Sequence, residues 1–294
     1  MSIAIIVNPT AGGTRSNRGR AAIALGSNVV DRDGTPAEWF LTTRPGHARD
    51  LAKAAVARGV RLVIAWGGDG TINEVASATA FTAVPLGIVP AGSGNGLARE
   101  LGIDMRPDRA IADAIRAEPR AMDVGEIGGR LFVNLAGIGF DAYVAGQFNA
   151  PGNRRRGLTG YASVAARALF RYRAAQYAIT TPEGRIDRRA VLVTIANSAQ
   201  FGNGACIAPG ACVDDGELDL VVVEDRSRIV TLGHVRRLFN GTANQMPGYT
   251  IQRIRQVTIA CDQPMLFHVD GEPVEGGTEL TARVHPAALR ICVK

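Results

Sequence analysis

The first hundred residues alternate short apolar runs with segments of helical spacing. Four apolar runs predict β-strands, at residues 3–7, 37–42, 61–66 and 86–89. Each is followed by a segment of helical periodicity, at residues 18–25, 47–58, 72–80 and 97–101. Strands that alternate with helices predict an α/β domain built on a parallel, doubly wound sheet. Ligands of such sheets bind outside the carboxyl ends of the strands, so we expect a site at that edge.

The pattern changes near residue 123, after which strand-like runs dominate. They predict strands at residues 130–135, 174–180, 190–196, 217–223, 256–260, 265–269, 279–284 and 289–293. Two helical patterns interrupt them, at residues 161–171 and 229–238. Many short strands separated by turn residues predict a β-rich antiparallel sandwich. We therefore expect an α/β domain over residues 1–124 and a β-rich domain over residues 125–286.

Composition narrows the class of protein. Hydrophobic residues make up 46% of the 294 residues and charged residues 20%, as in an ordinary globular protein with a core. The cysteines show no CxxC spacing and the N-terminus has no signal-peptide pattern, so we expect free thiols in a reducing, cytoplasmic setting. No apolar run approaches the roughly 18–20 residues that span a bilayer. The sequence therefore predicts no membrane-spanning helix.

The chain carries a net charge of +6. Such a charge favours anionic lipid or nucleic acid, and charge alone does not separate the two. Aromatic residues make up only 5% of the chain, which argues against a protein that stacks on single-stranded nucleic acid. We expect no nucleic-acid partner.

Three glycine-rich loops follow predicted strands, at residues 8–13, 67–71 and 90–96. Glycine lets a ligand approach the backbone closely, and a helix that begins after such a loop adds unpaired N–H groups that suit a phosphate. In the second loop, Thr71 and Glu74 fit a capping box, with Thr71 as N-cap and Glu74 reaching back to it. One such loop is weak evidence, but three at equivalent strand ends predict a nucleotide site.

Several familiar motifs are absent. No GxxxxGK[ST] sequence occurs and no GxGxxG follows the first strand, so a P-loop NTPase and an ordinary Rossmann dehydrogenase are disfavoured. Gly137-Ile138-Gly139 is interpreted as close backbone packing within the strand-rich half. The histidines form no HxxxH or HExxH pattern, and we assign them no catalytic role.

Residues 67–74 read GGDGTINE and resemble the GGDGTxNE motif of the diacylglycerol kinase catalytic-domain family, which includes sphingosine and ceramide kinases and bacterial soluble lipid kinases. Residues 8–12 resemble that family's NPxxG, and residues 90–99 its PxGTxNxxAR. The similarity continues in order through residues 132–141, 214–216 and 269–272, and so covers nearly the whole chain. One departure is Ser93-Gly94-Asn95, which is similar to the sphingosine kinase version of the third loop and leaves the acceptor lipid open.

The resemblance implies an ATP-dependent lipid kinase of phospholipid biosynthesis, with diacylglycerol as its acceptor. ATP would lie in a cleft between the two domains, and residues 287–294 would return to the first. Asp69 would hold the catalytic Mg²⁺, and Ser93 would contact phosphate or ribose. For Thr43, an ordinary cap before the helix at residue 47 is a nearly equal reading. The residues implied to bind ATP are Asn8, Pro9, Thr10, Ala11, Gly12, Thr43, Gly67, Gly68, Asp69, Gly70, Thr71, Ile72, Asn73, Ser93 and Asn95.

The resemblance also assigns roles in the second domain. Glu272, in a predicted hairpin turn, would be the general base that accepts the proton of the lipid hydroxyl. A second, structural Mg²⁺ would bind the Asp215 side chain and the carbonyl oxygens of Cys212 and Glu217.

A membrane contact is the last expectation. Three consecutive arginines occur at residues 154–156, and Arg167, Arg171 and Arg173 lie on or after a helix that carries Leu169 and Phe170. A charge run is usually a solvated face, but a kinase that acts on a membrane lipid needs a docking surface. We therefore expect a cytoplasmic protein that associates peripherally with membranes, and a homodimer stays open.

Three other functions remain as alternatives. They are a sphingoid-base or other lipid kinase, a kinase of a soluble substrate as in NAD kinase, and a non-catalytic regulator that binds nucleotide or lipid. The first and third glycine loops favour the lipid branch over NAD kinase. Intact Asp69 and Glu272 argue against the regulator.

Overall fold

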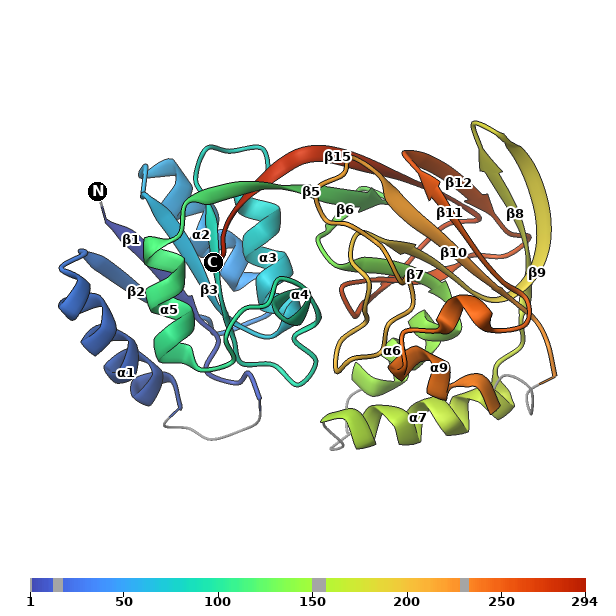
Figure 1. The fold of residues 1–294 in the computed structure, drawn as a ribbon, viewed down its shortest axis with the longest axis horizontal. Coiled ribbons are helices and arrows are strands. Elements are labelled where there is room, and N and C mark those ends of the chain that lie inside the picture. The colour runs from blue at the N-terminus through green and yellow to red at the C-terminus, as the bar shows by residue number, and fades with distance from the viewer. Residues whose placement is uncertain (1, 13–17, 150–156, 228–232) are drawn as a thin grey trace. The chain divides into compact units, whose positions relative to one another are not determined.

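A computed structural model describes residues 2–12, 18–149, 157–227 and 233–294 (Figure 1). The chain folds as two compact units. The first comprises residues 1–122 and 287–294, and the second comprises residues 123–286. The N-terminal unit is an α/β domain with parallel strands, and the second is a β-sandwich domain, as the apolar patterns predict.

The first unit is built on a parallel sheet. Its strands lie in the order β4-β3-β1-β2, and in the central register Ile5 lies between Ile64 and Trp39. Their side chains are buried on both faces in β1, β3 and β4, which explains the unbroken apolar runs in the sequence. The strands are β1 (Ile3–Val7), β2 (Ala37–Leu41), β3 (Leu62–Gly67) and β4 (Leu86–Pro90).

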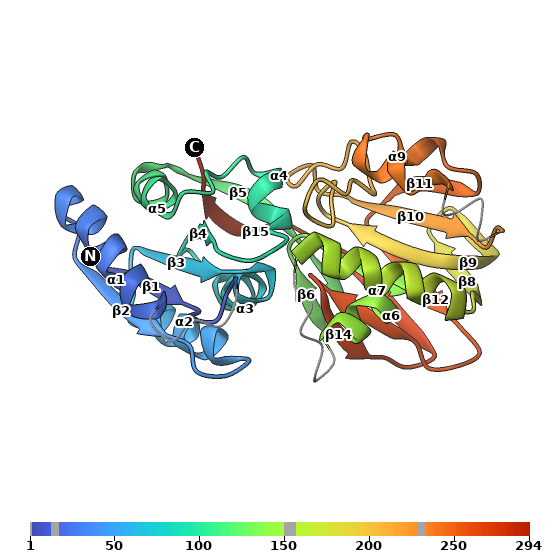
Figure 2. The ribbon, with the colours of Figure 1, turned by 90° about the horizontal axis from the view of Figure 1, so that it is seen from below.

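Helices cover both faces of this sheet (Figures 1 and 2). One face packs against α1 and α5, where Val30 and Ile111 join the core formed by alternate strand residues. Helices α2 and α3 pack against each other and against β1 and β3. Helix α5, with Pro107 in its first turn, was not predicted, and α1 is longer than predicted. The bounds are α1 (Arg18–Asp33), α2 (His47–Ala57), α3 (Asp69–Thr79), α4 (Gly96–Glu100) and α5 (Pro107–Arg116).

The end of the chain adds a strand to this first sheet. In β15 (Glu279–Cys292), Ile291 and Cys292 pair in parallel with Leu86 and Gly87 of β4. The predicted strands at 279–284 and 289–293 are therefore wrong as two elements, because one long strand runs through both. Burial of the Cys292 thiol in this sheet raises its pKa to about 11.

The strands of the second unit pair in an antiparallel arrangement. Strand β9 is long enough to serve two pairings: its first half pairs with β8, and its second half pairs with β7 on one side and β10 on the other. The strands are β5 (Pro119–Ile127), which begins in the first unit, β6 (Arg130–Phe132), β7 (Leu135–Gly139), β8 (Ala175–Thr181), β9 (Gly184–Ala196), β10 (Leu218–Glu224), β11 (Tyr249–Ile254), β12 (Gln256–Ala260), β13 (Leu266–Val269) and β14 (Glu272–Glu275).

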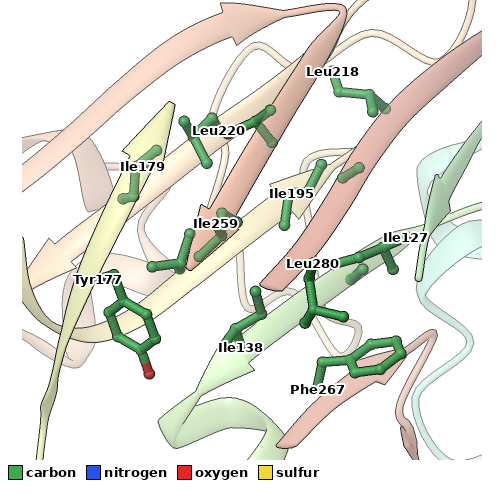
Figure 3. Packing of buried hydrophobic residues seen from close by; sticks show 14 of the residues in the cluster. Ile127, Ile138, Tyr177, Ile179, Ile195, Leu218, Leu220, Ile259, Phe267 and Leu280 are labelled. Atoms are coloured by element: carbon green, nitrogen blue, oxygen red, sulfur yellow. The ribbon is translucent and has the colours of Figure 1, made fainter. Parts of the chain in front are cut away.

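Branched aliphatic side chains fill the interior of this unit. Figure 3 shows Ile138, Ile195, Ile259, Leu280 and Phe267 meeting from different strands, and all of them are buried. Deletion of such a side chain removes both its transfer free energy and its packing contacts. The strands that form this core end in turns, and these turns carry the polar residues of the candidate site.

The elements predicted for the second unit differ from the observed ones in several places. The predicted strand at 130–135 is two strands, β6 and β7, separated by Val133 and Asn134. Helix α6 (Phe140–Asn149) was not predicted, and it packs against β13 and β14. The helix predicted at 161–171 is α7 (Gly157–Arg171). The helix predicted at 229–238 falls partly outside the described residues, and its described part contains α9 (Arg236–Phe239), which the 3₁₀ helix η1 (Ala243–Gln245) follows.

Across the parts of the chain that the structure describes, no helix has the length and apolar character to cross a bilayer.

Candidate functional site

The three glycine loops follow β1, β3 and β4, which are adjacent strands of one parallel sheet. Two of the loops touch through their backbones. A Cβ atom added at Gly92 would lie 2.6 Å from the Gly68 Cα atom, and one added at Gly68 would lie 3.1 Å from the Gly92 Cα atom. No side chain fits between these loops, so glycine at both positions is a packing requirement.

Asp69 ties the second loop to the third. Its carboxylate accepts the Asn95 N–H at 2.9 Å and the Gly96 N–H at 2.7 Å, one on each oxygen. These N–H groups belong to the start of α4, so the carboxylate also meets the positive end of that helix. These two hydrogen bonds fix the position of the Asp69 carboxylate between the second and third loops.

Asn95 shapes the third loop. Its backbone is left-handed, with φ 51°. Its side-chain oxygen accepts the Gly92 N–H at 2.8 Å, and its amide nitrogen donates to the Gly92 carbonyl at 3.0 Å. Asparagine tolerates this conformation better than most residues and makes such local bonds readily. The Asn95 side chain is buried and closes the loop on itself.

Asn8 ties the first loop to the second. Its side-chain nitrogen donates to the Thr71 hydroxyl at 3.0 Å, and its side-chain oxygen accepts from the Thr10 N–H and hydroxyl. A pocket of about 280 Å³ opens beside this loop, between the ends of β1, β3 and β4. It is lined by Val7, Asn8, Pro9, Ala11, Ala22, Trp66, Pro90, Ala91 and Pro107.

The predicted capping box at Thr71 and Glu74 is wrong. Helix α3 begins at Asp69 with Gly68 as its N-cap, so Thr71 lies inside the helix. Glu74 caps a different helix: its carboxylate accepts the N–H groups of Gly46 at 2.7 Å, Ala48 at 3.0 Å and Arg49 at 3.3 Å, at the start of α2. Sequence spacing identified a capping glutamate but assigned it to the wrong helix.

Glu74→Ala is expected to lower the free energy of unfolding by about 1–3 kcal/mol, because it leaves part-buried amides of α2 without their acceptor. Glu74→Gln, which keeps one acceptor oxygen, should cost less. Denaturant unfolding measures both. Asp50→Asn, an exposed acidic residue in the first turn of the same helix, is the control and should change stability by only a few tenths of a kcal/mol. Equal effects of Glu74→Ala and Asp50→Asn would contradict the capping role.

The other predicted nucleotide contacts differ in exposure. Thr43 and Ser93 are exposed, whereas Ile72 and Asn73 are buried within α3. The backbone N–H of Thr43 donates to Nδ1 of His47 at 3.1 Å, and α2 takes Gly46 rather than Thr43 as its N-cap. The cap reading of Thr43 is therefore wrong, and its contact with nucleotide stays a prediction. Gly13, the last residue of the first loop, lies outside the described residues.

In the second unit, Glu272 begins β14 directly after a tight turn. The turn residues Asp270 and Gly271 have φ angles of 49° and 86°, and Val269 pairs with Glu272 across the hairpin. Two consecutive left-handed residues are typical of the two-residue turn that joins antiparallel strands. The Glu272 side chain is exposed.

Asp270 anchors this turn, a role that the sequence analysis missed. Its buried carboxylate accepts the N–H groups of Val133 at 3.0 Å, Asn134 at 2.9 Å and Leu135 at 3.0 Å. Its own N–H donates to the Leu135 carbonyl at 2.9 Å. The backbone N–H groups between β6 and β7 thus converge on one carboxylate. Asp270 follows a strand and precedes a glycine, as countless turn residues do, so only the contact identifies its role.

The predicted structural cation site has a mixed environment. The Asp215 carboxylate accepts the Glu217 N–H at 3.1 Å and lies 3.7 Å from the Arg253 guanidinium, a cation that competes with a metal. The Cys212 thiol lies 3.0 Å from Asp214, and this hydrogen bond raises the thiol pKa. Within the described residues, no three His, Cys, Asp or Glu side chains gather where they could hold a metal. The side chains give poor support for a metal here, and binding by the two carbonyls stays a prediction.

Comparison with known proteins shows which protein family contains this arrangement of loops. The diacylglycerol kinase catalytic domain matches residues 2–127, which include all three loops. The YegS C-terminal NAD kinase beta sandwich-like domain matches residues 134–293. The chain belongs to the diacylglycerol kinase catalytic-domain family and has a YegS-type C-terminal domain. The two family matches are separated by residues 128–133, which lie close to the division between the two units.

Relatives of this family align with nearly the whole chain. A protein of Pseudomonas savastanoi pv. phaseolicola named "Probable lipid kinase YegS-like" is 31% identical over 91% of this chain and 89% of its own length. A protein of the same name from Pseudomonas aeruginosa strain PAO1 is 32% identical over 85% of this chain and 82% of its own length.

Solved structures share the fold of this diacylglycerol kinase family member. The crystal structure of a diacylglycerol kinase from Bacillus anthracis strain Sterne aligns with a TM-score of 0.73 at 18% identity, over 100% of this chain and 97% of the other. A second structure from that strain aligns over the same shares with a TM-score of 0.81 at 20% identity.

Proposed function

We propose that this protein is an ATP-dependent lipid kinase that transfers the γ-phosphate of ATP to the hydroxyl of a membrane lipid, with diacylglycerol as the most suitable acceptor. The observation that carries the proposal is the mutual anchoring of three glycine loops, through Asp69 and Asn8, at one edge of a parallel sheet. Membership of the diacylglycerol kinase catalytic-domain family supports the use of ATP.

The loops fit a triphosphate in two respects. The contact between Gly68 and Gly92 brings the backbones of the second and third loops together at one edge of the sheet, where both can face the same ligand. The start of α3, at Asp69, directs backbone N–H groups and the positive end of the helix dipole to the same edge. These groups would bind and orient the phosphates before transfer.

Asp69 also suits a magnesium ion carried by ATP. Magnesium prefers one or two carboxylates together with phosphate oxygens, and Asp69 supplies a carboxylate where the second and third loops meet. When bound, the ion would neutralise charge on the phosphate oxygens. The hydrogen bonds from the Asn95 and Gly96 N–H groups fix the position of the carboxylate in advance. This lowers the free-energy cost of arranging the carboxylate around a ligand.

Glu272 would act as the general base. As the lipid hydroxyl attacks the γ-phosphorus, its proton passes to the Glu272 carboxylate, the new P–O bond forms, and the bond to the β-phosphate oxygen breaks with ADP as the leaving group. The turn that carries Glu272 is anchored by three hydrogen bonds from backbone N–H groups to the Asp270 carboxylate. The Glu272 side chain is therefore attached to a backbone whose position is fixed.

The deciding experiment incubates the purified protein with γ-labelled ATP, Mg²⁺ and a total membrane lipid extract, and identifies the labelled product. Separate incubations contain diacylglycerol micelles, sphingosine micelles or NAD. We expect label in the diacylglycerol product. Label in sphingosine instead would revise the acceptor, label in NAD would replace the lipid-kinase proposal, and no labelled product in any incubation would favour a regulator.

We also propose that the exposed face of α7 docks on anionic membranes. Arg167 and Arg171 are exposed, and Phe170 between them is 59% exposed. These three residues share one helix face, whereas Ala168 and Leu169 are buried. The sequence analysis grouped Leu169 with the docking surface, and its burial excludes it from that face. The predicted basic run at 154–156 lies outside the described residues. Arginines beside an exposed aromatic ring suit a lipid surface.

The double replacement of Arg167 and Arg171 by serine is expected to weaken binding to anionic vesicles by about tenfold or more, since each arginine near such a surface contributes roughly 1 kcal/mol. Vesicle co-sedimentation measures this at low and high salt. The same replacement at the exposed residues Arg120 and Arg130 makes an equal change of net charge on other elements. Equal losses from both double variants would show a general charge effect without a docking face.

A further inference from the structure

A buried carboxylate and a buried imidazole meet beneath the turn that carries Glu272. His268 lies on β13, and Asp141 lies in the first turn of α6. The Nε2 atom of His268 is 3.4 Å from Oδ2 of Asp141, and the two side chains are only 4% and 6% exposed. The buried hydroxyl of Thr194 donates to the same Asp141 oxygen at 3.3 Å, and the Ala142 N–H donates to the other at 2.8 Å. The proposed phosphoryl transfer leaves this pair without a role.

The other ring nitrogen of His268 reaches the turn itself. Nδ1 accepts the Gly271 N–H at 3.2 Å. A neutral imidazole with its proton on Nε2 satisfies both neighbours, because Nε2–H then faces the Asp141 carboxylate and Nδ1 is free to accept. The opposite tautomer would set two N–H groups against each other at Gly271. Asp141 therefore selects the tautomer that can hold the turn.

Gly137 makes room for this pair. In the sheet it lies directly opposite His268. A Cβ atom at position 137 would collide with the Asp141 carboxylate and lie 2.7 Å from His268 Nε2. The first glycine of the Gly137-Ile138-Gly139 motif is thus explained by side-chain contact. Backbone packing explains only the second, where a Cβ atom at Gly139 would lie 2.6 Å from the Val191 carbonyl oxygen.

We propose that Asp141 and His268 are positioning residues that set the place of the Glu272 carboxylate by holding the Gly271 N–H. This inference rests on the proposed function, in which Glu272 is the base. Asp270 fixes the turn from the side of Val133 and Leu135, and His268 fixes the residue that directly precedes Glu272. Two independent anchors restrict the turn more closely than either alone, as general-base catalysis requires.

Two substitutions separate the two halves of the imidazole. In His268→Asn, the amide oxygen takes the place of Nδ1 and can accept the Gly271 N–H. In His268→Gln, the amide reaches the place of Nε2 and faces Asp141 instead. Both side chains are neutral and polar, so they share the cost of burial. We expect kcat of His268→Gln to fall at least about tenfold below that of His268→Asn, since small misplacements of a catalytic group are costly, with the KM for ATP similar in both.

Hydrogen exchange provides a readout that does not depend on activity. Exchange in peptides that cover residues 266–275 should be faster in His268→Gln than in His268→Asn. Equal kcat in the two variants, with equal exchange, would overturn the proposal, and so would a larger loss in His268→Asn. If the wild-type protein phosphorylates no substrate, the proposed function fails, but the exchange comparison still decides whether His268 holds the turn.

Discussion

Glu272→Gln is expected to lower kcat for lipid phosphorylation by about 10²–10⁴-fold, the usual contribution of a general base. Glutamine keeps the size and hydrogen-bonding capacity of glutamate, but its amide does not take up the hydroxyl proton. Because the side chain is exposed, the substitution should change the melting temperature little. Steady-state kinetics with diacylglycerol micelles measures the loss, and calorimetric titration with MgATP should show binding close to that of the wild type.

Glu275→Gln is the matched control for this prediction. Glu275 is exposed on the same strand, β14, where it pairs with Leu266, and the chemical change is identical. We expect its kcat to stay near the wild-type value. If Glu272→Gln retained kcat within a few-fold, or if both variants lost activity equally, Glu272 would not be the base.

The fold could be predicted because its signals are local. Strands such as β1 and β12 are fixed by apolar runs and by burial on one or both faces, and these patterns are present in the sequence itself. The alternation of strands with helices then implies a parallel sheet, since a parallel connection needs a crossover. Element ends were less certain: β9 extends well before residue 190, because its first half pairs with β8 along an exposed hairpin with few apolar residues.

The contacts within the candidate site could not be predicted because they are distant in sequence. Glu74 caps a helix 25 to 28 residues away, although its spacing from Thr71 fits a local capping box. Asp270 binds amides 135 to 137 residues away, and no periodicity indicates such a partner. Family resemblance selected the motif that contains Asp270, but the resemblance did not show that its carboxylate has a structural role.

Histidine illustrates the same limit. The four histidines lack any metal-ligand spacing, and nothing in the residues around His268 distinguishes it from the other three. Its environment depends on a sheet pairing with Gly137 and on a helix that was not predicted, α6, which supplies Asp141. A missed helix therefore concealed a buried pair, whereas the glycine motif that accommodates the pair was visible but open to a simpler reading.

Gly92→Ala is expected to abolish measurable MgATP binding and kinase activity, and to lower the free energy of unfolding by about 1–3 kcal/mol. The added methyl group would lie 2.6 Å from the Gly68 Cα atom and 2.9 Å from the Asn95 side-chain oxygen. To relieve this overlap, the second and third loops must separate. That movement strains the bonds from Asn95 and Gly96 to Asp69, which hold the proposed phosphate site together.

Two measurements distinguish this local effect from general unfolding. Titration with MgATP reports the site, and denaturant unfolding reports the whole chain. Gly277→Ala is the control, because a Cβ atom there would meet its nearest neighbours at 3.9 and 4.0 Å. We expect this control to bind MgATP like the wild type. If Gly92→Ala remained folded and bound MgATP with wild-type affinity, close contact between the loops would be unnecessary for nucleotide binding. The loops would then have separated enough to admit a methyl group while the phosphate site stayed intact.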